Sequence, residues 1–128
     1  MKSHLIYNDS VAFCKKCGYR VVTIESKEEQ TFLASQMKIH IPTPRSSYNN
    51  HGDNDGFFLD FYNPEGNQTI RMDNKSIVLF TIFADGQPNG MHHYIAAMGY
   101  DNWLWHDVAK RDRFQTVCEI GIKEFYVW

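Results

Sequence analysis

The sequence predicts an α+β fold with two helices, several short strands and a long loop region. A helix-capping pattern opens an amphipathic run near residue 26, and short β-branched or aromatic runs are separated by turn residues. Aromatic residues make up 15% of the chain, which favours a β-rich fold. The 128 residues suit a single domain, 1–128, that is long enough for one core.

Both predicted helices lie in the first third of the chain. Residues 4–7 form a short apolar run, which we expect to be an edge strand. Asn8-Asp9-Ser10 would supply N-cap residues for a helix over 11–16 that ends at Gly18. Residues 19–24, YRVVTI, read as a strand because they are rich in β-branched side chains.

The second helix has the clearer start signal. Ser26 followed by Glu29 is a capping box, which opens a helix to about residue 38. Residues that recur at helical spacing are expected to form its apolar face: Phe32, Leu33, Gln36 and Met37.

The middle of the chain is predicted to alternate loops and strands. Residues 41–55 hold two prolines, two serines and three asparagines, so we expect a long loop, which is usually functional or mobile. Strands are expected over 57–62, 69–72 and 77–83, with a turn at 63–66.

The stretch from Gly86 to Glu119 carries the candidate site. Apolar runs over 91–98, 103–108 and 116–122 read as strands, and polar residues lie at their ends in Gln87-Pro88-Asn89 and His106-Asp107. Amide oxygens, imidazoles and a carboxylate on loops above a sheet suit a cation or a polyol. Ordinary turn chemistry is the alternative interpretation, because turns use the same residue types.

Two sets of motifs in this order resemble the C-type lectin-like domain. The first half matches at Ala12-Phe13-Cys14, Gly18, Val21-Val22, Ile24, Ser26, Glu29 and Phe32-Leu33. The second half matches at Gly86-Gln87-Pro88-Asn89, Trp105-His106-Asp107 and Thr116-Val117-Cys118-Glu119. The resemblance covers nearly the whole chain and implies two helices that flank antiparallel β-sheets, with a long loop region.

The resemblance also implies a disulfide between Cys14 and Cys118. A second family bridge has no counterpart, because Tyr94 and Lys110 stand where its two cysteines would be. Cys17 is the third cysteine, so it is either free or pairs with another chain in a covalent dimer. A redox C-x-x-C motif formed with Cys14 is disfavoured because no βαβ context accompanies it.

For the site, the resemblance implies calcium ligands at Gln87, Asn89 and Asp107, with Pro88 in the cis form. His106 replaces the usual asparagine, and the usual glutamate position falls near His92. Only one carboxylate is left, and calcium affinity follows the number of charged ligands, so calcium should bind weakly or not at all.

Imidazoles suggest zinc as a second metal. His106 and Asp107 with either His92 or His93 would make a two-His, one-Asp site. Because the spacing matches no zinc motif, surface or half-buried histidines are the favoured interpretation. An enzyme is not expected, because no nucleophile elbow, Walker loop or HExxH helix is present.

The predicted function is a secreted recognition module that binds carbohydrate, with Trp103 near the site as a stacking residue. The alternative is metal-independent binding of a protein, as in an interaction or inhibitor protein. A net charge of −2 predicts no nucleic-acid partner, and no apolar run is long enough to span a membrane. Sequons at Asn8, Asn67 and Asn74 are compatible with a secreted glycoprotein, while residues 2–4 do not form a signal peptide.

Overall fold

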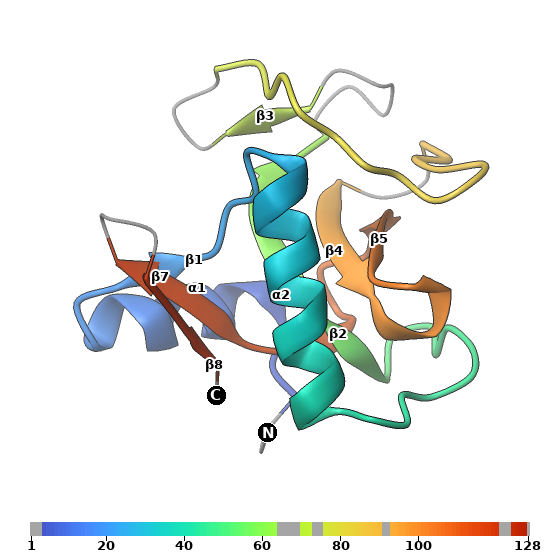
Figure 1. Cartoon of the computed structure of the whole chain (residues 1–128), viewed down its shortest axis with the longest axis horizontal. Coiled ribbons are helices and arrows are strands. Elements are labelled where there is room, and N and C mark those ends of the chain that lie inside the picture. The colour runs from blue at the N-terminus through green and yellow to red at the C-terminus, as the bar shows by residue number, and fades with distance from the viewer. Residues whose placement is uncertain (1–3, 64–69, 73–75, 91–92, 121–123, 128) are drawn as a thin grey trace.

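The computed structural model describes residues 4–63, 70–72, 76–90, 93–120 and 124–127. Its helices are α1 (Tyr7–Lys16), α2 (Lys27–His40) and a short 3-10 turn, η1 (Gly99–Asp101). Its strands are β1 (Arg20–Val21), β2 (Asp53–Tyr62), β3 (Arg71–Met72), β4 (Tyr94–Met98), β5 (Leu104–Val108), β6 (Arg113–Gln115), β7 (Val117–Ile120) and β8 (Glu124–Val127). The predicted α+β fold is therefore confirmed (Figure 1).

The strands form two sheets. One has the order β1-β7-β8, and the larger one has the order β3-β2-β4-β5 with β6 added beside β2. All pairings are antiparallel except that of β2 with β6, which is parallel. The expectation of antiparallel sheets therefore holds apart from this one pairing.

The two helices cover opposite faces of β2 (Figure 1). Leu33 of α2 packs in one core cluster with Phe57 and Leu59, whereas Cys14 of α1 packs in a second cluster with Phe58. Successive side chains of a strand point to opposite faces, so this alternation places β2 between the helices. The strand that leads toward the candidate site is thus buried on both sides.

The start of the chain differs from the prediction. Leu5 makes a single β-bridge with Phe114, and α1 begins at Tyr7 rather than at residue 11. Ile6 is the N-cap, so the prediction that residues 8–10 cap the helix is wrong. Ser10 is buried instead, and its Oγ lies 2.9 Å from Thr116 Oγ1, so a tertiary contact uses the hydroxyl that was expected to cap the helix.

The second helix begins as predicted. Ser26 Oγ accepts a hydrogen bond from Glu29 N at 3.1 Å, and α2 continues to His40, two residues beyond the prediction. Its buried residues are Gln30, Leu33 and Met37. Phe32 is 49% exposed, so its assignment to the apolar face is wrong. Gln30 takes the core position because its amide has partners there, as described below.

Two predicted strands are shorter than expected. Only Arg20 and Val21 of the run 19–24 belong to β1, since the N–H of Thr23 donates to the buried carboxylate of Glu119 at 2.5 Å. The run 77–83 joins no sheet beyond isolated bridges. Conversely, β2 begins at Asp53, inside the segment expected to be loop, and β6 and β8 were not anticipated.

The predicted disulfide is confirmed. Cys14 and Cys118 are bonded with their Cα atoms 5.6 Å apart, and both are fully buried. The bond joins α1 to β7 across a sequence separation of 104 residues. Among the residues described, no helix is both long and apolar enough to cross a membrane.

Candidate functional site

The candidate site begins at a turn that is anchored on β5. The peptide bond between Gln87 and Pro88 is cis, as the resemblance implied. Gly86 has a φ of 79°, a conformation that glycine adopts without strain, and Ala84 N donates to Trp105 O at 3.0 Å. These contacts hold the Gln87–Asn89 turn against the end of the strand that carries Asp107.

Asp107 organises this turn. Its side chain lies beneath the turn, and the residue is 5% exposed. Oδ1 accepts from Asn89 N at 3.1 Å and Oδ2 accepts from Gly90 N at 3.0 Å, while Asp107 N donates to Gln87 Oε1 at 3.3 Å. The structure thus brings Gln87, Asn89 and Asp107 together, and the side-chain oxygens of Gln87 and Asp107 accept backbone N–H groups at the turn.

His106 is held by a different neighbour. Its Nε2 lies 2.8 Å from Asp101 Oδ2, and its ring centroid lies 5.7 Å from that of Tyr100. Consecutive residues of β5 alternate in direction, so His106 and Asp107 leave the strand on opposite faces. His92, the remaining predicted ligand, lies outside the described residues.

The donor set does not fit a calcium cage. Calcium takes six to eight oxygen ligands and favours several carboxylates. Here the Asp107 carboxylate accepts two backbone N–H groups and the Gln87 amide oxygen accepts a third. Across the described ranges, no three His, Cys, Asp or Glu side chains lie close enough to hold a metal ion. Weak calcium binding and the zinc alternative both stay predictions, because His92 is not described.

A hollow of about 140 Å³ opens beside the turn. It is lined by Tyr48, Gln87, Asn89, Tyr100, His106, Asp107 and Val108. Apart from Val108 its lining is polar or aromatic, with amides, phenols and an imidazole all within one small concavity. Such a combination suits a ligand that is rich in hydroxyl groups.

Tyr48 reaches this hollow from the long loop, and sequence reasoning did not identify it. Its hydroxyl donates to Asp112 Oδ2 at 2.5 Å, and burial together with that carboxylate raises the pKa of Tyr48 far above its usual value. Asp112 is fully buried and also accepts from His51 N at 2.6 Å and Ala109 N at 3.0 Å. This carboxylate therefore ties the loop to the end of β5, a link that no local motif signals.

Trp103 is not at the surface. It is 2% exposed, its ring lies 6.3 Å from that of Phe57, and its carbonyl accepts from Gln30 Nε2 at 2.8 Å. The backbone of Trp103 has a φ of 64°, as part of the turn that directs the indole inward. Its predicted role as a stacking residue is therefore wrong. Tyr100, at 37% exposure, is the aromatic residue that faces solvent beside the hollow.

Trp105 lies in the core. It is fully buried, and its Nε1 donates to Gln30 Oε1 at 3.0 Å. Gln30 thus bonds both tryptophans, which explains why a glutamine occupies the buried face of α2.

Asp53 and Asp55 both make contacts with distant parts of the chain. Asp55 Oδ1 accepts from Gln115 Nε2 at 2.8 Å and lies 3.2 Å from His4 Nε2, while Asp53 accepts from Arg113 Nε at 2.5 Å. The Arg113 hydrogen bond lowers the pKa of Asp53. Burial acts to raise the pKa of Asp55, but its hydrogen bonds outweigh that and lower it. These carboxylates hold the start of β2 to the first residues and to β6.

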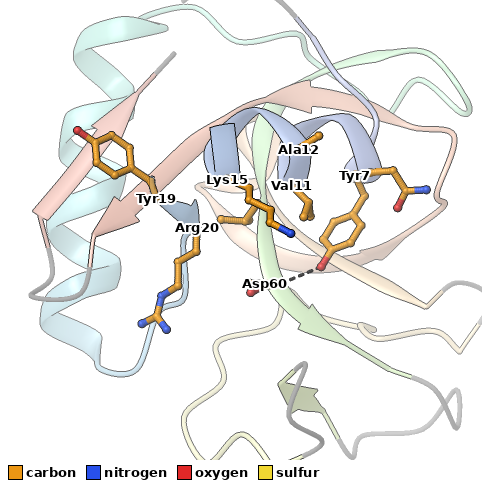
Figure 2. Close-up of a pocket in the computed structure, with 9 residues that line it drawn as sticks. Tyr7, Val11, Ala12, Lys15, Tyr19, Arg20 and Asp60 are labelled. Carbon is orange, nitrogen blue, oxygen red and sulfur yellow. Dashed lines mark hydrogen bonds between the residues drawn. The ribbon is translucent and has the colours of Figure 1, made fainter. Parts of the chain in front are cut away.

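A larger groove of about 580 Å³ lies between α1 and β1 (Figure 2). Its polar groups are mostly engaged inside the protein: Tyr7 donates to Asp60 at 2.7 Å across it, and Arg20 Nη2 pairs with Glu119 at 2.8 Å. Lys15 points into it from α1 (Figure 2). The groove offers few groups that could orient a ligand, whereas the hollow at the turn offers many.

Known proteins resemble this chain in sequence pattern and in fold. The family model for the Lectin C-type domain matches residues 3–120. Human lithostathine has a similar structure, with a TM-score of 0.71, 18% identity and coverage of 90% of this chain and 83% of that chain. The human scavenger receptor C-type lectin carbohydrate-recognition domain gives a TM-score of 0.70 at 15% identity, covering 92% and 84%. The SPL-1–GlcNAc complex gives 0.68 at 18% identity, covering 91% and 80%. No curated protein sequence matches this chain significantly.

Proposed function

Because this chain belongs to the C-type lectin domain family, we propose that it is a recognition module that binds carbohydrate through the hollow beside the Gln87–Asn89 turn. The proposal treats residues 1–128 as one domain whose role is binding rather than catalysis. The binding groups would be Gln87, Asn89 and His106, with Tyr100 in place of the buried Trp103. Asp107 would act by holding the turn in position.

The chemistry of the hollow is the observation that carries this proposal. Sugars present hydroxyl groups at their edges and C–H groups on their faces, so their sites combine hydrogen-bonding side chains with an aromatic ring. Tyr100 supplies the ring at 37% exposure, and Gln87 and Asn89 supply amides around the same concavity of about 140 Å³. The structural likeness to the scavenger receptor carbohydrate-recognition domain and to the SPL-1–GlcNAc complex supports the same ligand class.

We further propose that this binding does not depend on calcium. Asp107 is the carboxylate beneath the turn, and both its oxygens already accept backbone N–H groups. Pulling it toward an ion would take the acceptor away from the N–H groups of Asn89 and Gly90, which costs roughly 0.5–1.5 kcal/mol for each hydrogen bond.

An extracellular location is part of the proposal. The Cys14–Cys118 disulfide persists most readily in an oxidising compartment. Cys17 is exposed and makes no disulfide within the chain, so it is either a free thiol or a link to a second chain. A non-reducing gel of the protein after secretion would show which of these two states is present.

A glycan array tests the proposal, run once with calcium and once with chelator. We expect the same glycans to bind in both conditions. Tyr100→Ala should weaken binding about two- to tenfold, the range that an aromatic contact contributes. Tyr126→Ala is the matched control, because Tyr126 has the same 37% exposure but lies on β8 in the other sheet.

Two results would count against this reading. Binding that disappears with chelator would show that calcium is required after all. Absence of binding in both conditions would favour the second candidate, a protein ligand bound without metal. The observation behind that candidate is the same internal use of the Gln87 and Asp107 oxygens, which removes the groups that would hold an ion.

A further inference from the structure

His106 lines the hollow beside the turn with a ring that is held at one end. Its Nε2 lies 2.8 Å from Asp101 Oδ2, and its side chain is only 12% exposed. An ionised carboxylate can only accept hydrogen bonds, so Nε2 is the donor of this pair. Asp101 belongs to η1, which comes just before β5 in the chain, and the contact therefore ties two neighbouring elements together. Nδ1 is the ring nitrogen left for other contacts.

Nδ1 of His106 is open to the hollow. Within the described ranges it has no hydrogen-bond partner. The unpartnered side-chain atoms that are sealed from solvent in those ranges belong to Asn63 instead. A nitrogen that is neither bonded nor sealed reaches solvent, and the hollow of about 140 Å³ is the concavity that His106 lines. Because polar atoms inside a fold normally find partners, this nitrogen is available to a ligand.

Carboxylates border the hollow. Asp107 lies beneath the turn and Asp101 adjoins the ring of His106, whereas the lining residues that the structure describes include no lysine or arginine. Burial and, after it, the charge of Asp101 raise the pKa of Tyr100, so this carboxylate acts on the aromatic ring beside the hollow. With or without a proton on Nδ1, the Asp101–His106 pair carries no net positive charge.

We propose that the hollow is restricted to neutral sugars, that one sugar hydroxyl binds Nδ1 of His106, and that Asp101 is the positioning residue that orients the ring. These roles rest on the proposed function and add to it the class of sugar. A hydroxyl both donates and accepts hydrogen bonds, so it suits the free ring nitrogen. A sugar carboxylate or sulfate would instead give up its water, face Asp101 and Asp107, and find no cation among the described lining residues.

Matched pairs of methyl glycosides test the class of sugar. Methyl glucoside, galactoside and mannoside are each compared with the corresponding methyl uronide, which has a carboxylate in place of one CH₂OH group. Saturation-transfer NMR titrations with chelator present measure the affinities. We expect the neutral member of a pair to bind at least about tenfold more tightly than the uronide.

Asp101→Asn tests the contribution of charge to this preference. It removes one carboxylate at nearly constant shape, so the preference for the neutral sugar should shrink about two- to threefold. Asp85→Asn is the matched control, because Asp85 is exposed and lies outside the lining of the hollow. The control should leave the preference unchanged.

A double-mutant cycle tests the positioning role. His106→Ala should weaken binding of the neutral glycoside about two- to tenfold, which is the effect of one hydrogen bond. Asp101→Ala should weaken binding by no more than His106→Ala, and it should have no further effect in the His106→Ala background, because Asp101 acts through the ring. The ¹⁵N spectrum of the unaltered protein gives an independent reading: adding the glycoside should shift Nδ1 of His106 more than Nε2.

The possible results separate these roles from the proposed function. If none of the glycosides binds, the proposed function is wrong and the restriction to neutral sugars falls with it. If a uronide binds as tightly as its neutral partner, sugar binding stands and the restriction is wrong. Additive losses in the cycle, or a shift at Nε2 alone, would show that Asp101 does not position His106 for the ligand.

Discussion

Asp107→Asn is the substitution that tests most directly how the candidate site is built. Asparagine has nearly the same shape, but it offers one acceptor oxygen where the carboxylate offers two. In the structure the two carboxylate oxygens accept from Asn89 N and Gly90 N at 3.1 and 3.0 Å. After the substitution, one of these N–H groups would face the amide NH₂, which is also a donor.

The expected magnitude follows from these contacts. Asn89 and Gly90 are exposed, so water can replace the lost acceptor, and the broken hydrogen bond costs about 0.5–1.5 kcal/mol. The remaining hydrogen bond also loses its charge assistance. We therefore expect the free energy of unfolding to fall by about 1–2 kcal/mol. Because the turn would no longer be held against β5, we also expect glycan binding to be lost in the presence and absence of calcium.

Denaturant unfolding followed by tryptophan fluorescence measures this change, since Trp103 and Trp105 are both buried. Asp85→Asn is the control: Asp85 is exposed, in the same turn region, and its substitution should change stability by less than about 0.5 kcal/mol. If Asp107→Asn proved as stable as the control variant, the carboxylate would not organise the turn, and the account of the site given above would be wrong.

Three further predictions concern the frame around the site. Replacing Cys14 and Cys118 together by alanine should lower the free energy of unfolding by about 4.7 kcal/mol on the chain-entropy model. A loss below about 1 kcal/mol in a denaturant titration would show that the disulfide does not stabilise the protein by restricting the unfolded chain. Glu119→Gln should lower the free energy of unfolding by about 2 kcal/mol, because the new amide NH₂ would face the donors of Arg20 and Thr23 at a fully buried position. An unchanged thermal unfolding temperature would argue against the role given to these hydrogen bonds. The pKa values of Asp53 and Asp55 are lowered in the folded state, so their contribution to stability is present above about pH 4 and is lost as pH falls through the folded pKa. Unfolding measured from about pH 5 to 2 should show this loss, and Asp55→Asn should make the slope shallower.

Patterns that act over a few residues predicted the fold well. The capping box at Ser26 depends only on a hydroxyl meeting the N–H three residues later, and the structure has that bond at 3.1 Å. Alternating apolar runs likewise located β4 and β5 within a few residues. The 77–83 run failed for a physical reason: β-propensity describes a side chain that fits a pleated surface, and whether a neighbouring strand is present depends on the rest of the chain.

The candidate site was predictable only in part. The turn and the strand end that carry Gln87, Asn89 and Asp107 could be placed together because a family resemblance linked them. Tyr48 could not be found, because its position depends on a bond to Asp112, 64 residues away. Trp103 was misplaced because its sequence neighbours resemble those of an exposed turn, whereas a positive φ directs its ring into the core.

The sequence by itself therefore determined the class of fold, the cysteine pair that joins its ends, and the polar residues available at the turn. These depend on local hydrogen bonding and on the order of motifs, both of which can be read from a linear chain. Only the tertiary structure decided how those polar groups are used. The Asp107 carboxylate lies under the turn and accepts two backbone N–H groups. This contact depends on the packing of β5 against residues about 18 positions earlier, and it supports the proposal that binding does not depend on calcium.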